Sequence, residues 1–159
     1  MTALPTLRPA VPEDAPGVLA LFDAAIEWFV RIGNTGQWGT EPATGQPRWE
    51  ARAAEWCAGA DTWVAWHPEL GVSGALVLGD AVEYVPAARE PELYVRTLIG
   101  SRDPRAKGTG RRLLDFAAER ARERGLSLLR VDCYAGGSGD LVRFYESCGY
   151  RATETFRIG

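Results

Sequence analysis

Arg105-Ala-Lys-Gly-Thr-Gly110, followed by Arg111-Arg-Leu-Leu-Asp-Phe-Ala-Ala118, is the most informative part of this chain. A basic loop with two glycines leads here into an amphipathic helix, and the preceding run 92–99 has the composition of a β-strand. The first turn of a helix has unpaired N–H groups and a partial positive charge, and glycines let a ligand approach the backbone. The stretch therefore predicts a loop that binds a diphosphate.

Two common phosphate-binding loops do not fit these residues. A P-loop has the pattern G-x-x-x-x-G-K-[ST], and counting from Gly100 puts Arg105 where the second glycine belongs. A dinucleotide fingerprint has the pattern G-x-G-x-x-G, and Leu113 stands where its third glycine belongs. A nucleotide-binding enzyme of either kind is therefore disfavoured.

The pattern R-x-x-G-x-G does fit residues 105–110. It resembles the acetyl-CoA loop of the GNAT family of N-acetyltransferases, where the pattern is Q/R-x-x-G-x-G/A. Residues 138–150, with the sequence SGDLVRFYESCGY, resemble a second segment of that family, N-x-x-A-x-x-x-Y-x-x-x-G-F. Ser138, Leu141 and Tyr150 stand where the family usually has Asn, Ala and Phe. The opening residues 7–15 also resemble the family's first strand and helix, so the resemblance covers nearly the whole chain.

The resemblance implies an α/β fold with a mixed sheet flanked by about four helices, in a single domain over residues 1–159. Hydrophobic periodicity and turn residues predict helices over 13–32, 47–58, 110–124 and 140–147, and strands over 6–8, 62–66, 72–78, 92–99, 127–134 and 151–158. The strand, helix and strand of residues 92–134 are expected to form a parallel crossover. The resemblance also implies a bulge near 98–100, which would separate this strand from 127–134 and open a cleft; Gly100 is a suitable bulge residue.

The composition is that of an ordinary globular protein. The 159 residues are 46% hydrophobic and 25% charged, with a net charge of −3, which gives no general attraction for nucleic acid or an anionic membrane. The chain shows no secretory signal and no apolar run long enough to cross a membrane. Its three cysteines lack metal-ligand spacing, so we expect free thiols in a cytoplasmic protein with no metal site.

The resemblance implies acetyl-CoA as co-substrate and an N-acetyltransferase that acts on the amine of a small molecule or peptide by direct attack in a ternary complex. A catalytically silent CoA-binding or sensor domain of the same fold is the alternative. Relatives often pair, so a homodimer is possible. The expected cofactor contacts are backbone groups for the pantetheine arm, the loop for the pyrophosphate and two residues downstream: Leu98, Ile99, Gly100, Arg105, Ala106, Lys107, Gly108, Thr109, Gly110, Arg111, Ser138 and Tyr145.

Tyr145 is the leading catalytic candidate. In the predicted helix it shares an apolar face with Leu141 and Phe144, yet brings a hydroxyl, and a core tyrosine bonded to a backbone carbonyl is an equal alternative from the residues alone. The matching tyrosine of the family commonly acts as general acid toward the CoA sulfur. Ser138 fits a helix N-cap as well as a cofactor contact.

The general base is left open between Glu83, Glu92 and Asp132, with a water chain as a further possibility. Asp132 shares a predicted strand face with Arg130, so an internal ion pair is the stronger expectation for it. Aromatic residues of the first two helices and two loops are candidates for the acceptor pocket, with a core role as the alternative: Trp28, Phe29, Trp38 and Tyr84.

Overall fold

The computed structural model describes residues 5–33, 35, 36, 38–59, 61–81, 85–133 and 140–151. Their helices and strands follow in the order β1 Thr6–Pro9, a 3-10 turn η1 Pro12–Asp14, α1 Ala15–Arg31, α2 Pro47–Cys57, β2 Asp61–His67, β3 Gly71–Gly79, β4 Glu92–Gly100, a 3-10 turn η2 Pro104–Ala106, α3 Thr109–Glu123, β5 Leu128–Val131 and α4 Asp140–Ser147.

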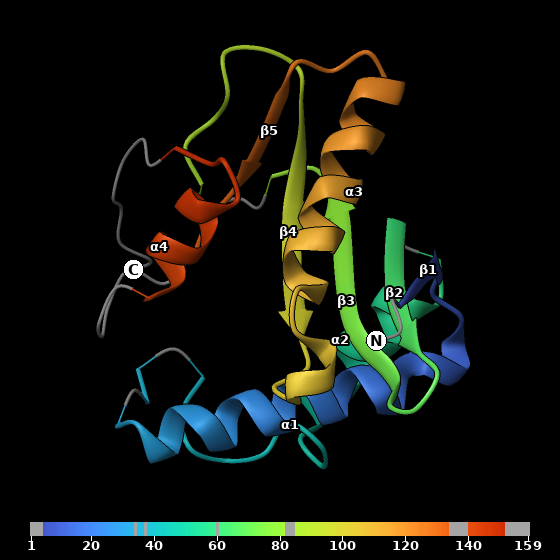
Figure 1. Cartoon of the computed structure of the whole chain (residues 1–159), viewed down its shortest axis with the longest axis vertical. Helices are drawn as coiled ribbons and strands as arrows, with labels where there is room; N and C mark the ends of the chain where they lie inside the picture. The colour runs from blue at the N-terminus through green and yellow to red at the C-terminus, as the bar shows by residue number, and fades with distance from the viewer. Residues whose placement is uncertain are drawn as a thin grey trace.

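The five strands form one mixed sheet in which their spatial order is their order in the sequence (Figure 1). β1, β2, β3 and β4 pair antiparallel with their neighbours, and β5 pairs parallel with β4. The parallel pair is joined through α3, as expected for the unit 92–134. Two adjacent parallel strands cannot be linked by a tight turn, so the helix between them is a requirement of the topology.

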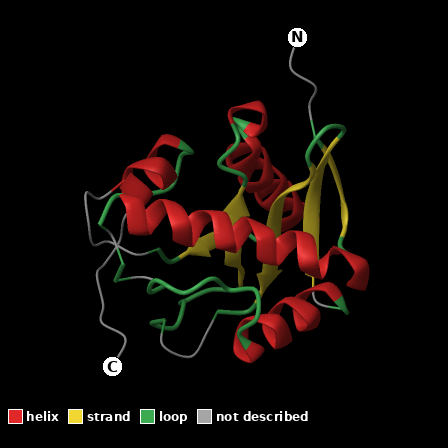
Figure 2. Cartoon of the chain, turned by 90° about the horizontal axis from the view of Figure 1, so that it is seen from below, coloured by secondary structure: helices red, strands yellow, loops and turns green. Residues whose placement is uncertain are grey.

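Helices cover both faces of the sheet (Figure 2). On one face α1 and α2 pack against Val64, Ala75 and Ile99, and the buried Phe22 and Trp49 form the centre of that core. On the other face the inward side chains of α3 pack against β3 and β4, and Phe144 and Tyr145 of α4 join this second core. The apolar stripes predicted from the sequence therefore become the inner faces of two separate helical layers.

A bulge in β4 lies at Arg96. Val77 of β3 pairs with Thr97, but the next residue of β3 pairs with Val95, so Arg96 is the extra residue. The expectation of a bulge at 98–100 was wrong by a few positions, because those residues pair with β3 in an unbroken register. The bulge also reverses which side chains of β4 face which core. Residues four apart in a regular strand share a face, but Val95 packs in the α3 core and Ile99 packs in the α1 core.

The predicted elements agree closely with the structure, with small differences at their ends. β1 includes Pro9, which pairs with Trp63, although the sequence suggested that this proline ends the strand. An edge strand accommodates proline because its outward N–H has no partner to lose. β5 ends at Val131, earlier than the predicted 134. The predicted last strand, 151–158, lies outside the described residues except for Arg151. No helix of the described residues is long and apolar enough to span a bilayer.

Candidate active site

The start of α3 is built to leave its amide groups accessible. Its N-cap, Gly108, has a left-handed backbone with φ of 90°, and glycine has no side chain with which to cap the first turn. A Cβ at Gly108 would have no atom within 4 Å, so the space beside this residue is open. The hydroxyl of Thr109 donates to the carbonyl of Ala106 at 2.6 Å and holds the loop against the helix. These residues fit an anionic ligand because the first N–H groups of α3 have no side-chain cap and can donate to it.

Two glycines bring this helix start close to the sheet. A Cβ at Gly74 of β3 would lie 2.7 Å from Cγ2 of Thr109, and one at Gly100 of β4 would lie 3.9 Å from the backbone N of Gly110. These two glycines also pair with each other across β3 and β4. Sequence reasoning missed Gly74, because its role depends on a helix that packs on it from 35 residues away along the chain.

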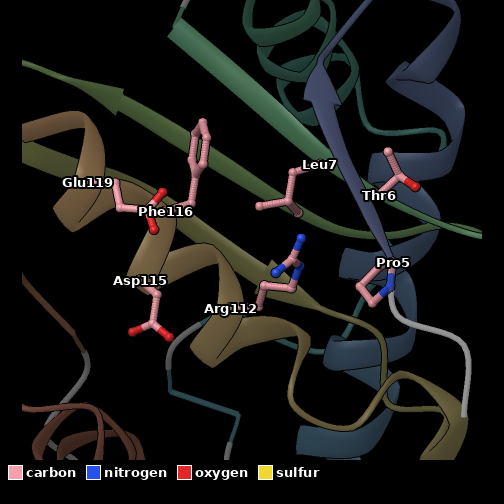
Figure 3. Close-up of a pocket in the computed structure, with 7 residues that line it drawn as sticks. All are labelled: Pro5, Thr6, Leu7, Arg112, Asp115, Phe116 and Glu119. Carbon is pink, nitrogen blue, oxygen red and sulfur yellow. The ribbon is translucent and has the colours of Figure 1, made fainter. Parts of the chain in front are cut away.

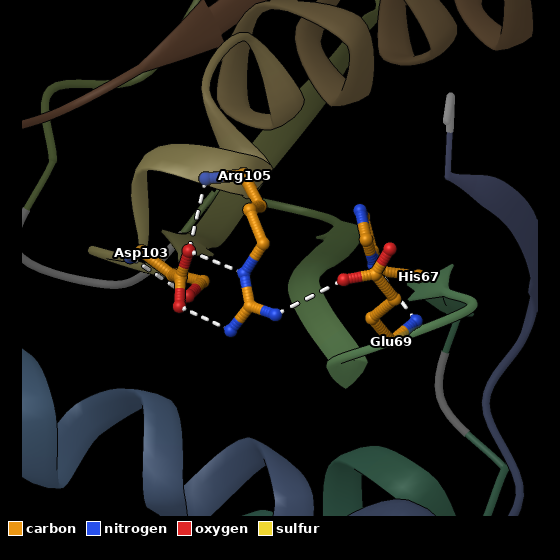
Figure 4. A network of polar contacts seen from close by, with 5 residues as sticks. His67, Glu69, Asp103 and Arg105 are labelled. Atoms are coloured by element: carbon orange, nitrogen blue, oxygen red, sulfur yellow. Dashed lines mark hydrogen bonds and ion pairs between the residues drawn. The ribbon is translucent and has the colours of Figure 1, made fainter. Parts of the chain in front are cut away.

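Arg105 is held by carboxylates of its own chain (Figure 4). Its guanidinium forks onto Asp103 at 2.9 and 3.0 Å, and its Nη1 donates to Glu69 at 3.1 Å. The backbone N–H of Glu69 donates to Nδ1 of the buried His67, which fixes the turn that presents Glu69. The hydrogen bonds from Arg105 lower the pKa of the Asp103 carboxyl to about 2.

The other basic residues of the loop and helix differ in what they contact. Arg111 donates to the carbonyl of Ser147 at 2.8 Å, which links α3 to the last turn of α4. Lys107 is exposed and has no ion-pair partner among the described residues. Arg112 lines a separate hollow of about 620 Å³ between α3 and β1 (Figure 3). The predicted phosphate loop therefore has one unpaired ammonium group and two guanidinium groups with contacts to the protein.

β4 and β5 run together for four residues and then part. Their register ends at the pair Val95 and Val131, where β4 bulges, while β4 continues to Gly100. Figure 1 shows the two strands diverging, with α4 on the side of β5 away from β3. The expected separation of these strands is present, and the bulge at Arg96 lies where it begins.

Tyr145 lies in α4 with its side chain in the α3-side core, beside the rings of Phe144 and Tyr150 at centroid distances of 5.4 and 5.8 Å. Burial, followed by the nearby Cys133, raises the pKa of its hydroxyl well above the usual range. A tyrosine hydroxyl is protonated at neutral pH even at its ordinary pKa of about 10, and the rise leaves it so, which is the state that a proton donor requires. Phe144 also lies against the start of α3, where a Cβ at Gly110 would be 3.1 Å from its ring.

The carboxylates near the parting strands have different partners from those expected. Both oxygens of Glu92 accept hydrogen bonds from Arg130, one of them at 2.8 Å. The Tyr94 hydroxyl donates to Oδ1 of Asp132 at 2.5 Å. The expected pairing of Arg130 with Asp132 was therefore wrong, since neighbours across β4 and β5 take both groups.

Trp28 and Trp38, two of the three aromatic candidates for the acceptor pocket within the described residues, have different surroundings. Trp38 packs against Phe22, Phe29 and Trp49 at centroid distances of 5.3, 5.4 and 6.3 Å, so it belongs to the core between α1 and α2. Trp28 is 37% exposed and lies under the guanidinium of Arg102. Glu83, Tyr84 and Ser138 lie outside the described residues. Within those residues no three His, Cys, Asp or Glu side chains are grouped to hold a metal ion.

Comparison with known protein families gives one match that covers most of the chain. The sequence profile of the Acetyltransferase (GNAT) family matches residues 22–150. The chain belongs to the GNAT acetyltransferase family. That match includes the loop pattern of residues 105–110 and the segment 138–150, two of the three parts from which the resemblance was drawn, but not the opening residues 7–15. No curated protein sequence matches the chain.

Solved structures show the GNAT fold over almost the whole chain. A mutant of the BH1408 protein from Bacillus halodurans matches with a TM-score of 0.71 at 17% identity, covering 97% of this chain and 98% of that chain. Ribosomal-protein-alanine N-acetyltransferase from Brucella melitensis biovar Abortus 2308 matches at 0.62 and 18% identity, covering 97% of both chains. AAC(6')-Iy, in complex with the bisubstrate analogue CoA-S-monomethyl-acetylneamine, matches at 0.67 and 12% identity, covering 99% and 97%. At these identities the likeness is one of fold.

Proposed function

We propose that this GNAT protein is an acetyl-CoA-dependent N-acetyltransferase, formed by one domain over residues 1–159, that transfers acetyl to the amine of a small molecule or peptide. The observation that carries the proposal is the uncapped, glycine-initiated start of α3 beside the end of β4, at the edge where β4 and β5 have separated. This arrangement offers backbone donors to a diphosphate and an open strand edge to an extended arm.

In this proposal the residues of the loop hold the pyrophosphate of acetyl-CoA. The amides at the start of α3 donate to it, and Lys107 adds a charge that is not used within the described structure. Arg105, whose three side-chain nitrogens all contact Asp103 or Glu69, can join by exchanging these contacts for phosphate, whereas Arg111 uses only Nη2 on Ser147 and keeps other N–H groups for phosphate. The backbone of Leu98, Ile99 and Gly100 lies beyond the end of β5, and its outer edge is the proposed partner of the pantetheine arm. The thioester supplies an activated acetyl group.

Tyr145 is the proposed general acid. Its α4 helix packs on the start of α3 through Phe144, so the hydroxyl and the phosphate loop are held in one structural unit. A departing thiolate can take a proton from a neutral hydroxyl, and the Tyr145 hydroxyl is neutral at pH 7. Ser138 remains a proposed cofactor contact or N-cap of the same segment.

Asp132 is the proposed general base among the described carboxylates. Tyr94 alternates with Leu93 and Val95, which face α3, so Tyr94 and its partner Asp132 lie on the face of the sheet that α1 covers elsewhere. Glu92 lies on that face too, but Arg130 occupies both of its oxygens. Glu83 remains a candidate on sequence grounds.

The base has a defined task. An amine with the ordinary lysine pKa of about 10.4 must lose a proton to attack, and at pH 7 this costs between about 4 and 5 kcal/mol. A carboxylate on the acceptor side of the sheet, acting directly or through one water, can receive that proton. The acceptor would then approach from the α1 side while the diphosphate lies on the α3 side. Trp28 and Tyr84 are the proposed aromatic residues of that approach, whereas Trp38 belongs to the core.

The test has two stages. Binding of CoA is measured by calorimetry on the full chain, and release of free thiol from acetyl-CoA is measured with a panel of aliphatic amines, amino acids and short peptides. CoA binding with amine-dependent thiol release supports the proposal. CoA binding without transfer to any amine favours the alternative, a silent CoA-binding domain. Absence of CoA binding overturns both.

A further inference from the structure

Arg102 and Trp28 form an exposed pair that joins the loop after β4 to α1. The guanidinium carbon of Arg102 lies 4.4 Å from the centroid of the Trp28 ring. At this distance the ring face holds the flat guanidinium by cation–π attraction and stacking. A stacked guanidinium keeps its N–H groups around its edge, where they are available to a planar anion such as a carboxylate.

Carboxylates in the same loop and on the same stretch of α1 already have other partners. Asp103, the next residue, is forked by Arg105. On α1, Asp23 accepts the backbone N–H of Thr44 at 2.9 Å, and Glu27 pairs with Arg31. Arg102 has no ion-pair partner within the described parts of the chain. Its charge is held in a fixed place by an aromatic ring and is not neutralised by these neighbours.

The position of the pair relates it to the proposed acetyl-transfer site. Arg102 follows Gly100 by two residues, so their Cα atoms are at most about 7 Å apart. Trp28 belongs to α1, and the preceding turn of that helix packs with Ile99 in the core on the side away from α3. The pair thus lies beside residues 98–100, the proposed partner of the pantetheine arm. It is on the face of the sheet that also carries Asp132.

We propose that the edge of Arg102, held by Trp28, binds a carboxylate of the acyl acceptor, so that the acceptor is an amine that also carries a carboxylate, of the amino-acid or short-peptide kind. This inference rests on the proposed acetyltransferase function. Ile32, the C-cap residue of α1, is 48% exposed, and its backbone N–H donates to the carbonyl of Trp28, so it follows Trp28 by one helical turn. An apolar side chain of the acceptor, next to its carboxylate, can pack on the exposed side chain of Ile32.

The experiment compares acceptors that differ only in this charge. Alanyl-phenylalanine and its C-terminal amide have the same amine and the same apolar side chain, and the extended dipeptide spans about 7 Å. Free phenylalanine and phenethylamine form a second, shorter pair. We expect kcat/KM of the wild-type protein to favour the carboxylate in at least one pair by about 10- to 100-fold, the range of a hydrogen-bonded charge pair.

Three variants separate the parts of the pair. Arg102→Gln should remove the preference by raising KM for the carboxylated acceptor, with little change for the amide. Trp28→Leu keeps the charge but removes the ring that orients it, and should reduce the preference. Arg122→Gln makes the same change at an exposed arginine near the other end of α3, and should leave the preference unchanged.

The outcomes distinguish this inference from the proposed function. If the wild-type protein acetylates amines without regard to the carboxylate, or if Arg102→Gln preserves the preference, the acceptor site is wrong while the acetyltransferase proposal stands. If Arg102→Gln instead weakens CoA binding in calorimetry, the guanidinium belongs to the cofactor and the inference is overturned. If wild-type protein binds no CoA, the proposed function itself fails.

Discussion

The hydroxyl of Tyr94 donates to Oδ1 of Asp132 from the neighbouring strand, at the place where β4 and β5 begin to separate. Tyr94 is 1% exposed, whereas Asp132 is half-buried. The bond fixes the Asp132 carboxylate next to the last residue pair of β4 and β5, Val95 and Val131. No hydrogen bond to the second oxygen, Oδ2, is seen from the residues that the structure describes, so that oxygen is available for a proton.

Asp132→Asn tests the role of this carboxylate as general base. Asparagine keeps the oxygen that accepts from Tyr94 but cannot take a proton, so we expect kcat to fall by about 100- to 10,000-fold while CoA affinity is retained. Thiol-release kinetics and calorimetry measure the two effects. Asp115→Asn, at an exposed position of α3, is the matched control. A kcat equal to that of the wild-type protein would assign the base to another group.

Tyr145→Phe tests the general acid. Removal of the hydroxyl should lower turnover strongly, by about 100-fold or more, because the thiolate then leaves without its proton donor. CoA affinity should stay nearly the same. Tyr150→Phe is the control: its hydroxyl is buried without a partner among the described residues, so its loss should leave turnover unchanged and stability unchanged or higher. Similar turnover in the two variants would remove Tyr145 from the acid role.

Gly108→Val tests the start of α3. The left-handed backbone of Gly108 costs a side-chain-bearing residue about 1–2 kcal/mol, and the valine would occupy the open space proposed for phosphate. We expect a lower melting temperature, a folded protein and loss of CoA binding. Gly125→Val, with φ of 71° at the other end of α3, should show the same loss of stability with CoA binding intact. Equal CoA affinities would place the cofactor elsewhere.

Asp14→Asn tests a buried ion pair beneath the start of α1. Arg8 forks onto Asp14 at 2.8 and 2.9 Å, and this contact is the main cause that lowers the pKa of the carboxyl. The pair therefore stabilises the fold above the ordinary aspartate pKa of about 3.9, and this contribution is lost as pH falls through the lower folded value.

Urea unfolding measured from pH 7 down to about pH 3 checks this sign. We expect Asp14→Asn to lose about 1–2 kcal/mol at pH 7 and to approach the wild-type stability as the pH falls. Glu119→Gln, at an exposed position without an ion-pair partner among the described residues, should follow the wild-type curve. A constant difference between Asp14→Asn and the wild-type protein across this range would contradict the assignment.

Periodicity and turn residues were enough to predict the helices and most strands. The apolar stripe of α3 and the glycine that ends it are local signals, so its start and end were placed within about one residue. The bulge at Arg96 has no such signal, since it depends on how β3 and β4 pair. As a result the face on which each residue of β4 lies could not be predicted past Val95.

The site shows the same limit. The loop pattern and the position of Tyr145 were visible in the sequence because each is a short, local motif. The partners of Asp132 and Arg102 lie 38 and 74 residues away along the chain, at Tyr94 and Trp28, and only the packed structure brings them together. Pairing preferences across strands are too weak to choose such partners from sequence alone.

The order of the strands has a consequence for how the protein is made. Because β1 to β4 neighbour one another in the order of synthesis, their meander can form as soon as β4 has left the ribosome. β5 can join only when the crossover helix has emerged and folded back. We expect the proposed catalytic groups, Asp132 and Tyr145, to come together last, once the meander of β1 to β4 is already in place.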